Sequence, residues 1–274
     1  MHRVANLTMY QPLPTHDLQQ IDPFILLHHH GPHRFEPYNK GLPFGPHPHR
    51  GFETVTLIFE GNVVHHDSQG FKSTIREGGV QWMTAARGIV HSEQLDKEMQ
   101  EHGGPLEIIQ LWINLPSKLK MSRPNYQGFQ KESIPVKTLD NGNVAVNIIS
   151  GIFGGSNGPV QSITGIQLST ISMKAGGQFE TEVDPGRNIL LYVMDGEVTV
   201  NGTKLTSRTL AEFENDAAGI RIEAGKDSRI VFGNGEPYNE PIVTHGPFVM
   251  NTTTEIMQAM RDYQMGKMGI LIEE

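Results

Sequence analysis

Residues 46–53 read Pro-His-Pro-His-Arg-Gly-Phe-Glu, and residues 88–93 read Gly-Ile-Val-His-Ser-Glu. Each stretch has two side chains that can bind metals, two positions apart. Because successive side chains of a β-strand point to opposite faces, residues two apart share a face. If both stretches are strands facing each other inside a barrel, three imidazoles and one carboxylate converge on a mononuclear metal site. The predicted metal ligands are His47, His49, His91 and Glu93.

Histidine is concentrated in the first part of the chain. Of the 13 histidines, 12 lie within residues 1–102, and only His245 lies outside. Chance would spread them more evenly. The two halves of the chain are therefore expected to have different roles, with the chemistry in the first half.

The composition narrows the class of protein. A chain of 274 residues has room for one large domain or two ordinary ones. Its net charge of −8 argues against direct nucleic-acid binding, which needs a dense basic surface. The absence of cysteine removes disulfides and thiolate ligands, so imidazole and carboxylate are the main metal ligands available.

The sequence favours a cytoplasmic protein with no membrane partner. Residues 1–20 lack the charged start and apolar run of a signal peptide. No apolar stretch approaches the roughly 20 residues that a membrane helix needs.

Short strands between turns are the expected secondary structure. The chain has 30 glycines and 17 prolines, and brief runs rich in Val, Ile, Thr and Phe lie between them. Residues 54–59 lead into a turn at 60–62, and residues 188–194 lead into a turn at 195–197. This pattern predicts an all-β sandwich or barrel rather than alternating strands and helices.

The same two segments resemble each other at an offset of 135 residues, about half the chain. The offset predicts two barrels of similar build, joined within the proline-rich, basic residues 115–135. We expect an N-terminal, metal-binding barrel at 1–130 and a C-terminal barrel plus helix at 131–274. At the same offset the four ligand positions hold no histidine, so the second barrel is expected to bind no metal. Those positions are Glu182, Asp184, Lys226 and Ser228.

One helix is predicted near the C-terminus. Thr252 and Glu255 fit a capping box, in which the N-cap and N3 side chains each bond the other's backbone N–H. Gly266 is placed to end the helix. The apolar residues that follow the cap at helical spacing are Ile256, Met260 and Tyr263.

Residues 47–56, His-Pro-His-Arg-Gly-Phe-Glu-Thr-Val-Thr, resemble the metal-binding segment of the pirin family of bicupins. So do residues 81–93, Gln-Trp-Met-Thr-Ala-Ala-Arg-Gly-Ile-Val-His-Ser-Glu. Residues 22–24 and the segment 241–251 are similar to that family as well. The resemblance implies two cupin-type β-barrels, with one metal ion per chain, usually iron, in the N-terminal barrel. The family's ligands fall on the four residues that strand geometry selects.

The sequence departs from the family pattern after residues 22–24. Pirins commonly have an acidic-aromatic stretch there, whereas this chain has His28, His29 and His30. Because neighbours on a strand point to opposite faces, at most two of the three can act together. We expect a solvated loop, or histidines that support the site through hydrogen bonds.

The carboxylate ligand has a second candidate. The general cupin pattern HxHxxxE would assign it to Glu53, at an even spacing from His49. Glu93 ranks first, because its spacing of two from His91 places both on one face without an extra bend.

Other polar residues near these stretches are expected to support the fold rather than to bind metal. His65 and His66 are expected to be a strand pair with one ring outward. Arg50 and Arg87, next to the ligand pairs, are expected to anchor strands through hydrogen bonds, with an anionic substrate as the alternative.

The resemblance implies quercetin 2,3-dioxygenase activity, in which a flavonol ring is opened with release of carbon monoxide. Nitrogen and oxygen ligands suit Fe(II), Mn(II), Ni(II), Cu(II) or Zn(II), and the family favours iron. An enolic or phenolic substrate would bind the metal through oxygen, lose a proton to a nearby carboxylate, and react with O2. In this interpretation Glu93 is ligand and base, and Glu53 is the fallback base.

The alternative function belongs to another class. The pirin family also includes non-enzymatic regulatory proteins that bind a protein partner and use the redox state of the metal as a switch. The acidic composition is compatible with such a partner and argues against direct DNA contact. Turnover of a flavonol by the iron-loaded protein would distinguish an enzyme from a regulator.

Overall fold

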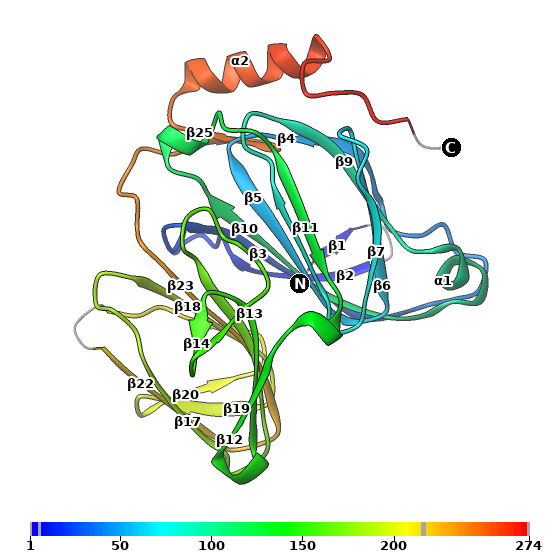
Figure 1. Cartoon of the computed structure of the whole chain (residues 1–274). Coiled ribbons are helices and arrows are strands. Elements are labelled where there is room, and N and C mark those ends of the chain that lie inside the picture. Colours follow the sequence, from blue (N-terminus) through cyan, green and yellow to red (C-terminus); the bar gives the residue numbers. More distant parts are fainter. Residues whose placement is uncertain (1, 5–6, 215–217, 273–274) are drawn as a thin grey trace. The chain divides into compact units, whose positions relative to one another are not determined.

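The computed structural model describes residues 2–4, 7–214 and 218–272 (Figure 1). The chain forms two compact units. The first consists of Met1–Gln11, Ile25–Lys131 and Tyr238–Glu274, and the second of Pro12–Phe24 and Glu132–Pro237. The predicted segments 1–130 and 131–274 assign the C-terminal residues to the second barrel, whereas in the structure they lie within the first unit.

Two β-sheets build the first unit. The larger has seven strands in the order β1-β2-β3-β10-β5-β8-β11, and the smaller has four in the order β4-β9-β6-β7. The strands of the larger sheet are β1 (His2–Val4), β2 (Leu7–Leu13), β3 (Phe24–Phe35), β10 (Gly104–Asn114), β5 (Phe52–Glu60), β8 (Val80–Thr84) and β11 (Asn125–Phe129). Those of the smaller sheet are β4 (Phe44–His49), β9 (Ile89–Gln94), β6 (Asn62–Asp67) and β7 (Lys72–Arg76).

β5 lies inside the larger sheet and is buried on both faces along most of its length. Phe52 contacts the ring of His49 on β4, and Thr56 donates a hydrogen bond to Glu93 on β9. Both partners belong to the smaller sheet, so the even-numbered residues of β5 face the space between the sheets. The residues that alternate with them, such as Val55, face the other side.

An apolar cluster fills part of the space between these two sheets. Its members come from both sheets and from the connections, and each fully buried aliphatic side chain stabilises the fold by about 1.5–3 kcal/mol. We therefore expect the core of the first unit to fold without a metal ion. The cluster consists of Leu7, Leu42, Ile58, Val63, Ile75, Leu95, Met99, Leu106 and Ile108.

The second unit repeats the two-sheet design, which confirms the expected all-β architecture with two barrels. Its sheets have the strand orders β12-β13-β16-β23-β18-β21 and β17-β22-β19-β20. The first comprises β12 (Val136–Leu139), β13 (Val144–Ser150), β16 (Gln167–Met173), β23 (Ser228–Gly235), β18 (Asn188–Asp195) and β21 (Thr209–Ala211). The second comprises β17 (Gln178–Glu182), β22 (Gly219–Ala224), β19 (Glu197–Val200) and β20 (Thr203–Thr206). The second unit also has a short hairpin, β14 (Ile152–Phe153) with β15 (Ser156–Asn157), and the first unit has another, β24 (Val243–His245) with β25 (Phe248–Met250).

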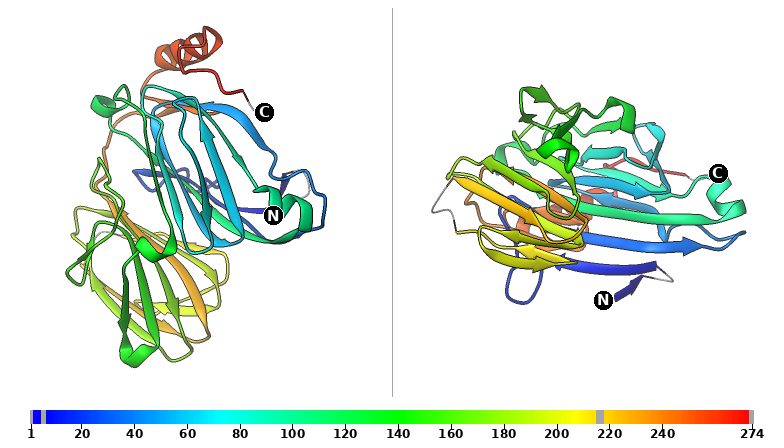
Figure 2. Two further views of the ribbon diagram at one scale, coloured as in Figure 1. Left: turned by 45° about the vertical axis from the view of Figure 1, so that its right-hand side comes forward. Right: turned by 90° about the horizontal axis from the view of Figure 1, so that it is seen from below.

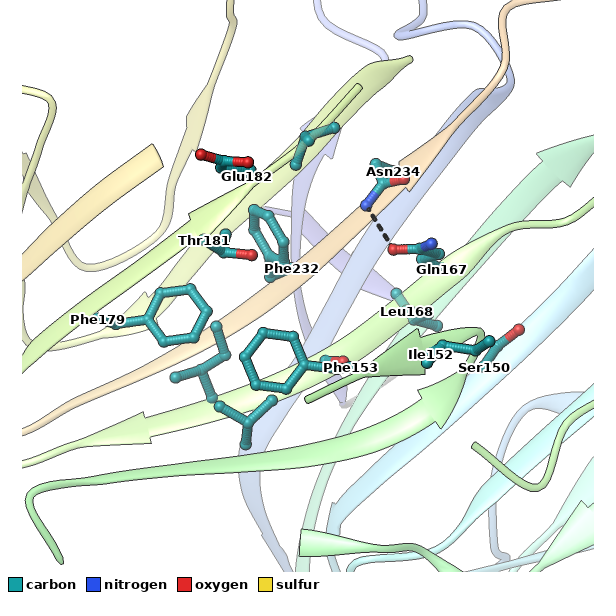
Figure 3. A pocket seen from close by; sticks show the side chains of 14 residues that line it. Ser150, Ile152, Phe153, Gln167, Leu168, Phe179, Thr181, Glu182, Phe232 and Asn234 are labelled. Carbon is teal, nitrogen blue, oxygen red and sulfur yellow. Dashed lines mark hydrogen bonds between the residues drawn. The ribbon is translucent and has the colours of Figure 1, made fainter. Parts of the chain in front are cut away.

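The interior of the second unit is filled by its own side chains. Figure 3 shows Phe153 and Phe179 side by side, with ring centroids 5.8 Å apart, next to Phe232. The cavity left among them measures about 20 Å³, which is room for roughly one water molecule. Of the positions that correspond to the predicted ligands, Glu182 lines this cavity and Asp184 accepts a hydrogen bond from the backbone of Gly186.

The predicted capping box is confirmed at the start of α2 (Thr253–Gln264). Glu255 N donates to Thr252 Oγ1 at 3.2 Å, and Thr252 N donates to Glu255 Oε2 at 2.8 Å. Ile256 packs against the core of the first unit, but Tyr263 is 40% exposed, so the predicted apolar face is narrower than expected. The helix, orange in Figure 1, lies at one end of the first unit, as the left view of Figure 2 also shows.

The other helical segments are short. Within the described ranges, no helix is long and apolar enough to cross a membrane. The segments are α1 (Lys97–His102) and the 3-10 turns Ser117–Leu119, Lys131–Ser133 and Asp140–Gly142.

A buried ion pair fastens α2 to the turn that follows β4. Arg50 Nη1 donates to Asp262 Oδ2 at 3.0 Å, and the two side chains are 5% and 10% exposed. Hydrogen bonds from Lys267, and then from Arg50 and Gln258, lower the pKa of Asp262 from 3.8 to about 2, while burial opposes them. The carboxylate therefore stabilises the fold above about pH 4, and this contribution is lost as the pH falls through 2.

Replacing Asp262 with alanine is expected to lower the free energy of unfolding by about 3 kcal/mol, because Arg50 is left buried and unpaired. Urea unfolding at pH 7 and at pH 3 measures this loss, which should shrink at the lower pH. Lys204→Ala is the control, since Lys204 pairs with Glu197 but is 63% exposed; it should cost less than about 1 kcal/mol. Equal losses in the two variants would contradict the prediction.

Candidate metal centre

Three histidines converge between the two sheets of the first unit. His47 and His49 lie on β4, and His91 lies on the neighbouring strand β9, directly opposite His47 in the antiparallel register. Their metal-binding nitrogens all lie within 4.8 Å of one another, and Nε2 of His47 is 3.1 Å from Nε2 of His49. Strand alternation thus brings together the three imidazoles that the i, i+2 spacing selects.

A backbone contact fixes which nitrogen of His47 faces the cluster. Its Nδ1 lies 2.7 Å from the carbonyl oxygen of Gly45. A carbonyl only accepts hydrogen bonds, so the proton is on Nδ1 and the lone pair is on Nε2. The hydrogen bond from Nδ1 to Gly45 thus orients the ring so that Nε2 faces the other two histidines, as a metal ligand requires.

The rings of His49 and His91 are in the uncharged form that binds metals. His49 and His91 are 2% and 1% exposed. Burial, and then the neighbouring imidazoles, hold the pKa of both rings well below the ordinary value of 6.5. Neither ring nitrogen of His91 meets a hydrogen-bond partner in the described part of the chain. Buried polar groups are rarely left in this way, and a transition-metal ion would satisfy the nitrogen that carries the lone pair, so the residues fit a metal.

Aromatic side chains from the larger sheet cover the cluster. Phe52 of β5 and Trp112 of β10 lie with ring centroids 5.0 Å and 5.2 Å from that of His49. Their own centroids are 4.3 Å apart. The histidines therefore face an apolar, aromatic wall, which limits the access of water.

Glu93 lies on β9, two residues after His91, and is 4% exposed. Its two carboxylate oxygens accept one hydrogen bond each: Oε1 from Thr56 Oγ1 at 2.8 Å, and Oε2 from Gln110 Nε2 at 3.0 Å. Each oxygen retains a lone pair. The group of converging atoms within 4.8 Å consists of the histidines alone, so Glu93 as the fourth ligand stays a prediction.

Glu53 has a different environment. It is fully buried, and its Oε1 accepts a hydrogen bond from Thr84 Oγ1 at 2.6 Å on the neighbouring strand β8. Burial raises its pKa to about 7, although the hydrogen bond from Thr84 opposes the shift. Alternation along β5 places Glu53 on the face opposite to Thr56 and its partner Glu93. Its role as fallback base stays a prediction, which this position does not favour.

His65, which the sequence placed only in a strand pair with His66, lies beside the three-histidine cluster. It is 1% exposed, its Nε2 lies 3.0 Å from Asp67 Oδ2, and its ring centroid is 5.4 Å from that of His91. Tyr126 of β11 stacks on its other side, with centroids 4.0 Å apart. His65 and Asp67 have the same two-residue spacing as the ligand pairs. That spacing was the available signal, but only the pairing of β6 with β9 shows that they face the cluster.

The three consecutive histidines do not form a loop, so that expectation is wrong. They belong to β3, and alternation separates them: Nε2 of His29 lies 3.0 Å from Oε1 of Glu107, whereas the ring of His30 contacts the ring of Phe44. Arg50 anchors strands as expected, because its Nε donates to the carbonyl oxygen of Arg87 at 2.6 Å.

The fold and this cluster define a double-barrel protein of the cupin class, with three histidines in one barrel that could hold a metal ion. Comparisons with known proteins specify the family. The family model described as "Pirin" matches residues 5–113, and the model described as "Pirin C-terminal cupin domain" matches residues 168–269. The chain belongs to the pirin family.

Its relatives include proteins with an enzymatic name. A Pseudomonas aeruginosa protein provisionally named quercetin 2,3-dioxygenase is 37% identical over 264 residues, which cover 96% of this chain and 91% of that protein. A pirin-like protein of Caulobacter vibrioides is 39% identical over 266 residues, which cover 96% of this chain and 93% of that protein. The crystal structure of quercetin 2,3-dioxygenase from Acinetobacter baumannii superposes with a TM-score of 0.90 at 36% identity. The superposition covers 97% of this chain and 98% of that protein.

Replacing His47, His49 or His91 with alanine is expected to weaken metal binding by at least about 100-fold, because each removes one converging nitrogen. The melting temperature of the metal-free protein should change little, since the apolar core is separate from the cluster. Elemental analysis and thermal melting measure the two effects. His102→Ala, on the exposed face of α1, is the control and should keep its metal. Global unfolding of the three variants would contradict the prediction.

Glu93→Ala is expected to weaken metal binding about 10- to 100-fold, whereas Glu53→Ala should leave it unchanged. The reason is that Glu93 shares a strand face with His91, while Glu53 faces away. Titration of the two metal-free variants with Fe(II) without oxygen compares them directly. The reverse order would show that the HxHxxxE pattern governs this site.

Proposed function

We propose that this protein is a metal-dependent dioxygenase of the quercetin 2,3-dioxygenase type, acting on a flavonol or a related enolic or phenolic compound. The observation that carries this proposal is the convergence of three imidazoles within 4.8 Å, in a chain of the pirin family. The similarity to proteins named quercetin 2,3-dioxygenase supports the choice of substrate class.

One transition-metal ion per chain would be held by His47, His49, His91 and Glu93. Donors of nitrogen and oxygen suit Fe(II), which we favour, as well as Mn(II), Ni(II), Cu(II) and Zn(II). Once bound, the ion supplies Lewis acidity to a substrate oxygen and a site for reaction with O2. The overall reaction consumes one O2 and releases one carbon monoxide for each flavonol ring opened.

The chain's own side chains bind and orient the substrate. Phe52 and Trp112 offer flat apolar surfaces beside His49, which suit a planar aromatic ring and exclude water. Excluding water strengthens the electrostatic interactions at the reacting oxygen.

Glu93 is the group that we assign to proton transfer. The hydroxyl of an enolic substrate would pass its proton to a carboxylate oxygen of Glu93, and the electron pair would remain on the substrate oxygen. Thr56 and Gln110 hold the carboxylate in place through one hydrogen bond each. The same geometry allows Glu93 to return the proton later in the cycle.

The iron-loaded protein is expected to consume oxygen and release carbon monoxide with quercetin, because the aromatic wall and the carboxylate lie at one cluster. An oxygen electrode and a carbon monoxide assay measure both gases. The metal-free protein and iron-treated His91→Ala are the controls, since free iron oxidises flavonols slowly. Equal rates for wild type and His91→Ala would overturn the enzymatic proposal, and the regulatory alternative, with a protein partner, would then lead.

A further inference from the structure

His30, within β3, is buried and lacks a hydrogen-bond partner. Its side chain is 2% exposed, and neither ring nitrogen meets a donor or acceptor among the residues that the structure describes. Its neighbours differ, since His28 Nε2 lies 3.1 Å from Gln11 Oε1 and His29 bonds Glu107. Most buried polar side chains in proteins are bonded, so two unbonded nitrogens indicate a missing partner.

The ring of His30 lies between the two sheets of the first unit. β3 belongs to the larger sheet and β4 to the smaller, and the centroids of His30 and Phe44 are 5.4 Å apart with the rings edge to face. Phe44 is the register partner of Glu93 and lies on the same strand as His47. His30 therefore lies between the two sheets on the Glu93 side of the predicted metal centre.

His30 carries no charge at neutral pH. Burial, and then the neighbouring His28 and His29, lower its pKa to about 3. An uncharged imidazole has one N–H donor and one acceptor nitrogen. It therefore complements a group that both donates and accepts, such as a hydroxyl beside a carbonyl, and offers no charge to a carboxylate.

We propose that His30 is a substrate-binding residue that hydrogen-bonds a hydroxyl or carbonyl oxygen of an uncharged phenolic ligand lying against Phe44. This role rests on the proposed function, because it requires a phenolic substrate between the sheets. His30 orients the ring and takes no part in holding the metal. Its unbonded nitrogens reduce the stability of the ligand-free protein and are satisfied when the ligand binds.

The test measures quercetin binding apart from turnover. Equilibrium dialysis of the metal-loaded protein without oxygen gives the dissociation constant. His30→Phe removes both nitrogens and keeps a buried aromatic ring, so the dissociation constant should rise about 3- to 10-fold, the loss of one uncharged hydrogen bond. Metal content should be unchanged, and the melting temperature of the ligand-free protein should not fall.

His33→Phe is the matched control, with the same chemical change on the same strand. His33 is half-buried, with its ring against Phe35, and lies three residues beyond His30. This variant should bind quercetin like the wild type.

The outcomes separate the two proposals. Equal quercetin affinity in wild type and His30→Phe overturns the role of His30, leaves the proposed function intact, and means that the nitrogens hold only water. Loss of bound metal from His30→Phe also overturns it. If the wild type does not bind quercetin, the flavonol class fails, and catechol becomes the probe. His30→Phe must then weaken catechol binding by the same factor. Equal catechol affinity in wild type and His30→Phe, or no catechol binding by the wild type, overturns the inference as well.

Discussion

The first unit buries several imidazoles between its two sheets, and the need to give each of them a bonding partner constrains the rest of its structure. A buried polar group costs free energy unless it is bonded, and the penalty is greatest where water is excluded. The unit meets this demand in two ways. His29 and His65 are paired with the carboxylates of Glu107 and Asp67. His47, His49 and His91 converge on one another instead, an arrangement that only an external ligand such as a metal ion satisfies fully.

β5 divides the carboxylates of the unit between two environments. Glu53 and Thr56 lie on opposite faces of this strand, and Thr56 reaches Glu93 across the space between the sheets. A shift of one residue in the register would exchange the faces and bury Glu53 among the histidines. The apolar residues on both faces oppose such a shift, because β5 is buried on each side. Packing thus keeps Glu53 on the face away from the histidines, which supports the prediction that Glu93 is the carboxylate ligand.

The sequence predicted the features that depend on local spacing. The i, i+2 rule gave the three converging histidines, and the reciprocal cap of Thr252 and Glu255 gave the start of α2. Features that depend on distant strands could not be predicted in this way. His65 faces the cluster only because β6 pairs with β9, and the three consecutive histidines became strand because β3 pairs inside the larger sheet.

Lys120 shows the same limit. It lies in the basic, proline-rich segment expected to be a surface connection, yet it is 1% exposed. Its ammonium donates to the carbonyl oxygens of Gly51 and Val249 and to Asn114 Oδ1, at 2.8, 3.0 and 2.6 Å. Val249 follows Lys120 by more than a hundred residues, so no local pattern marks this contact. A buried lysine is tolerated because three acceptors surround it.

The C-terminal segment belongs to the first unit because it completes the support of the metal-binding strands. Gly51, directly after the β4 histidines, has φ of +92°, and a Cβ there would overlap the carbonyl oxygen of Val249 on β25. Only glycine permits this close approach, which also brings Arg50 to Asp262 of α2. The histidines of β4 are therefore held between β9 on one side and the returning C-terminus beyond the turn. The chain itself thus fixes the geometry of the three histidines, which is the preorganisation that the predicted metal site would need.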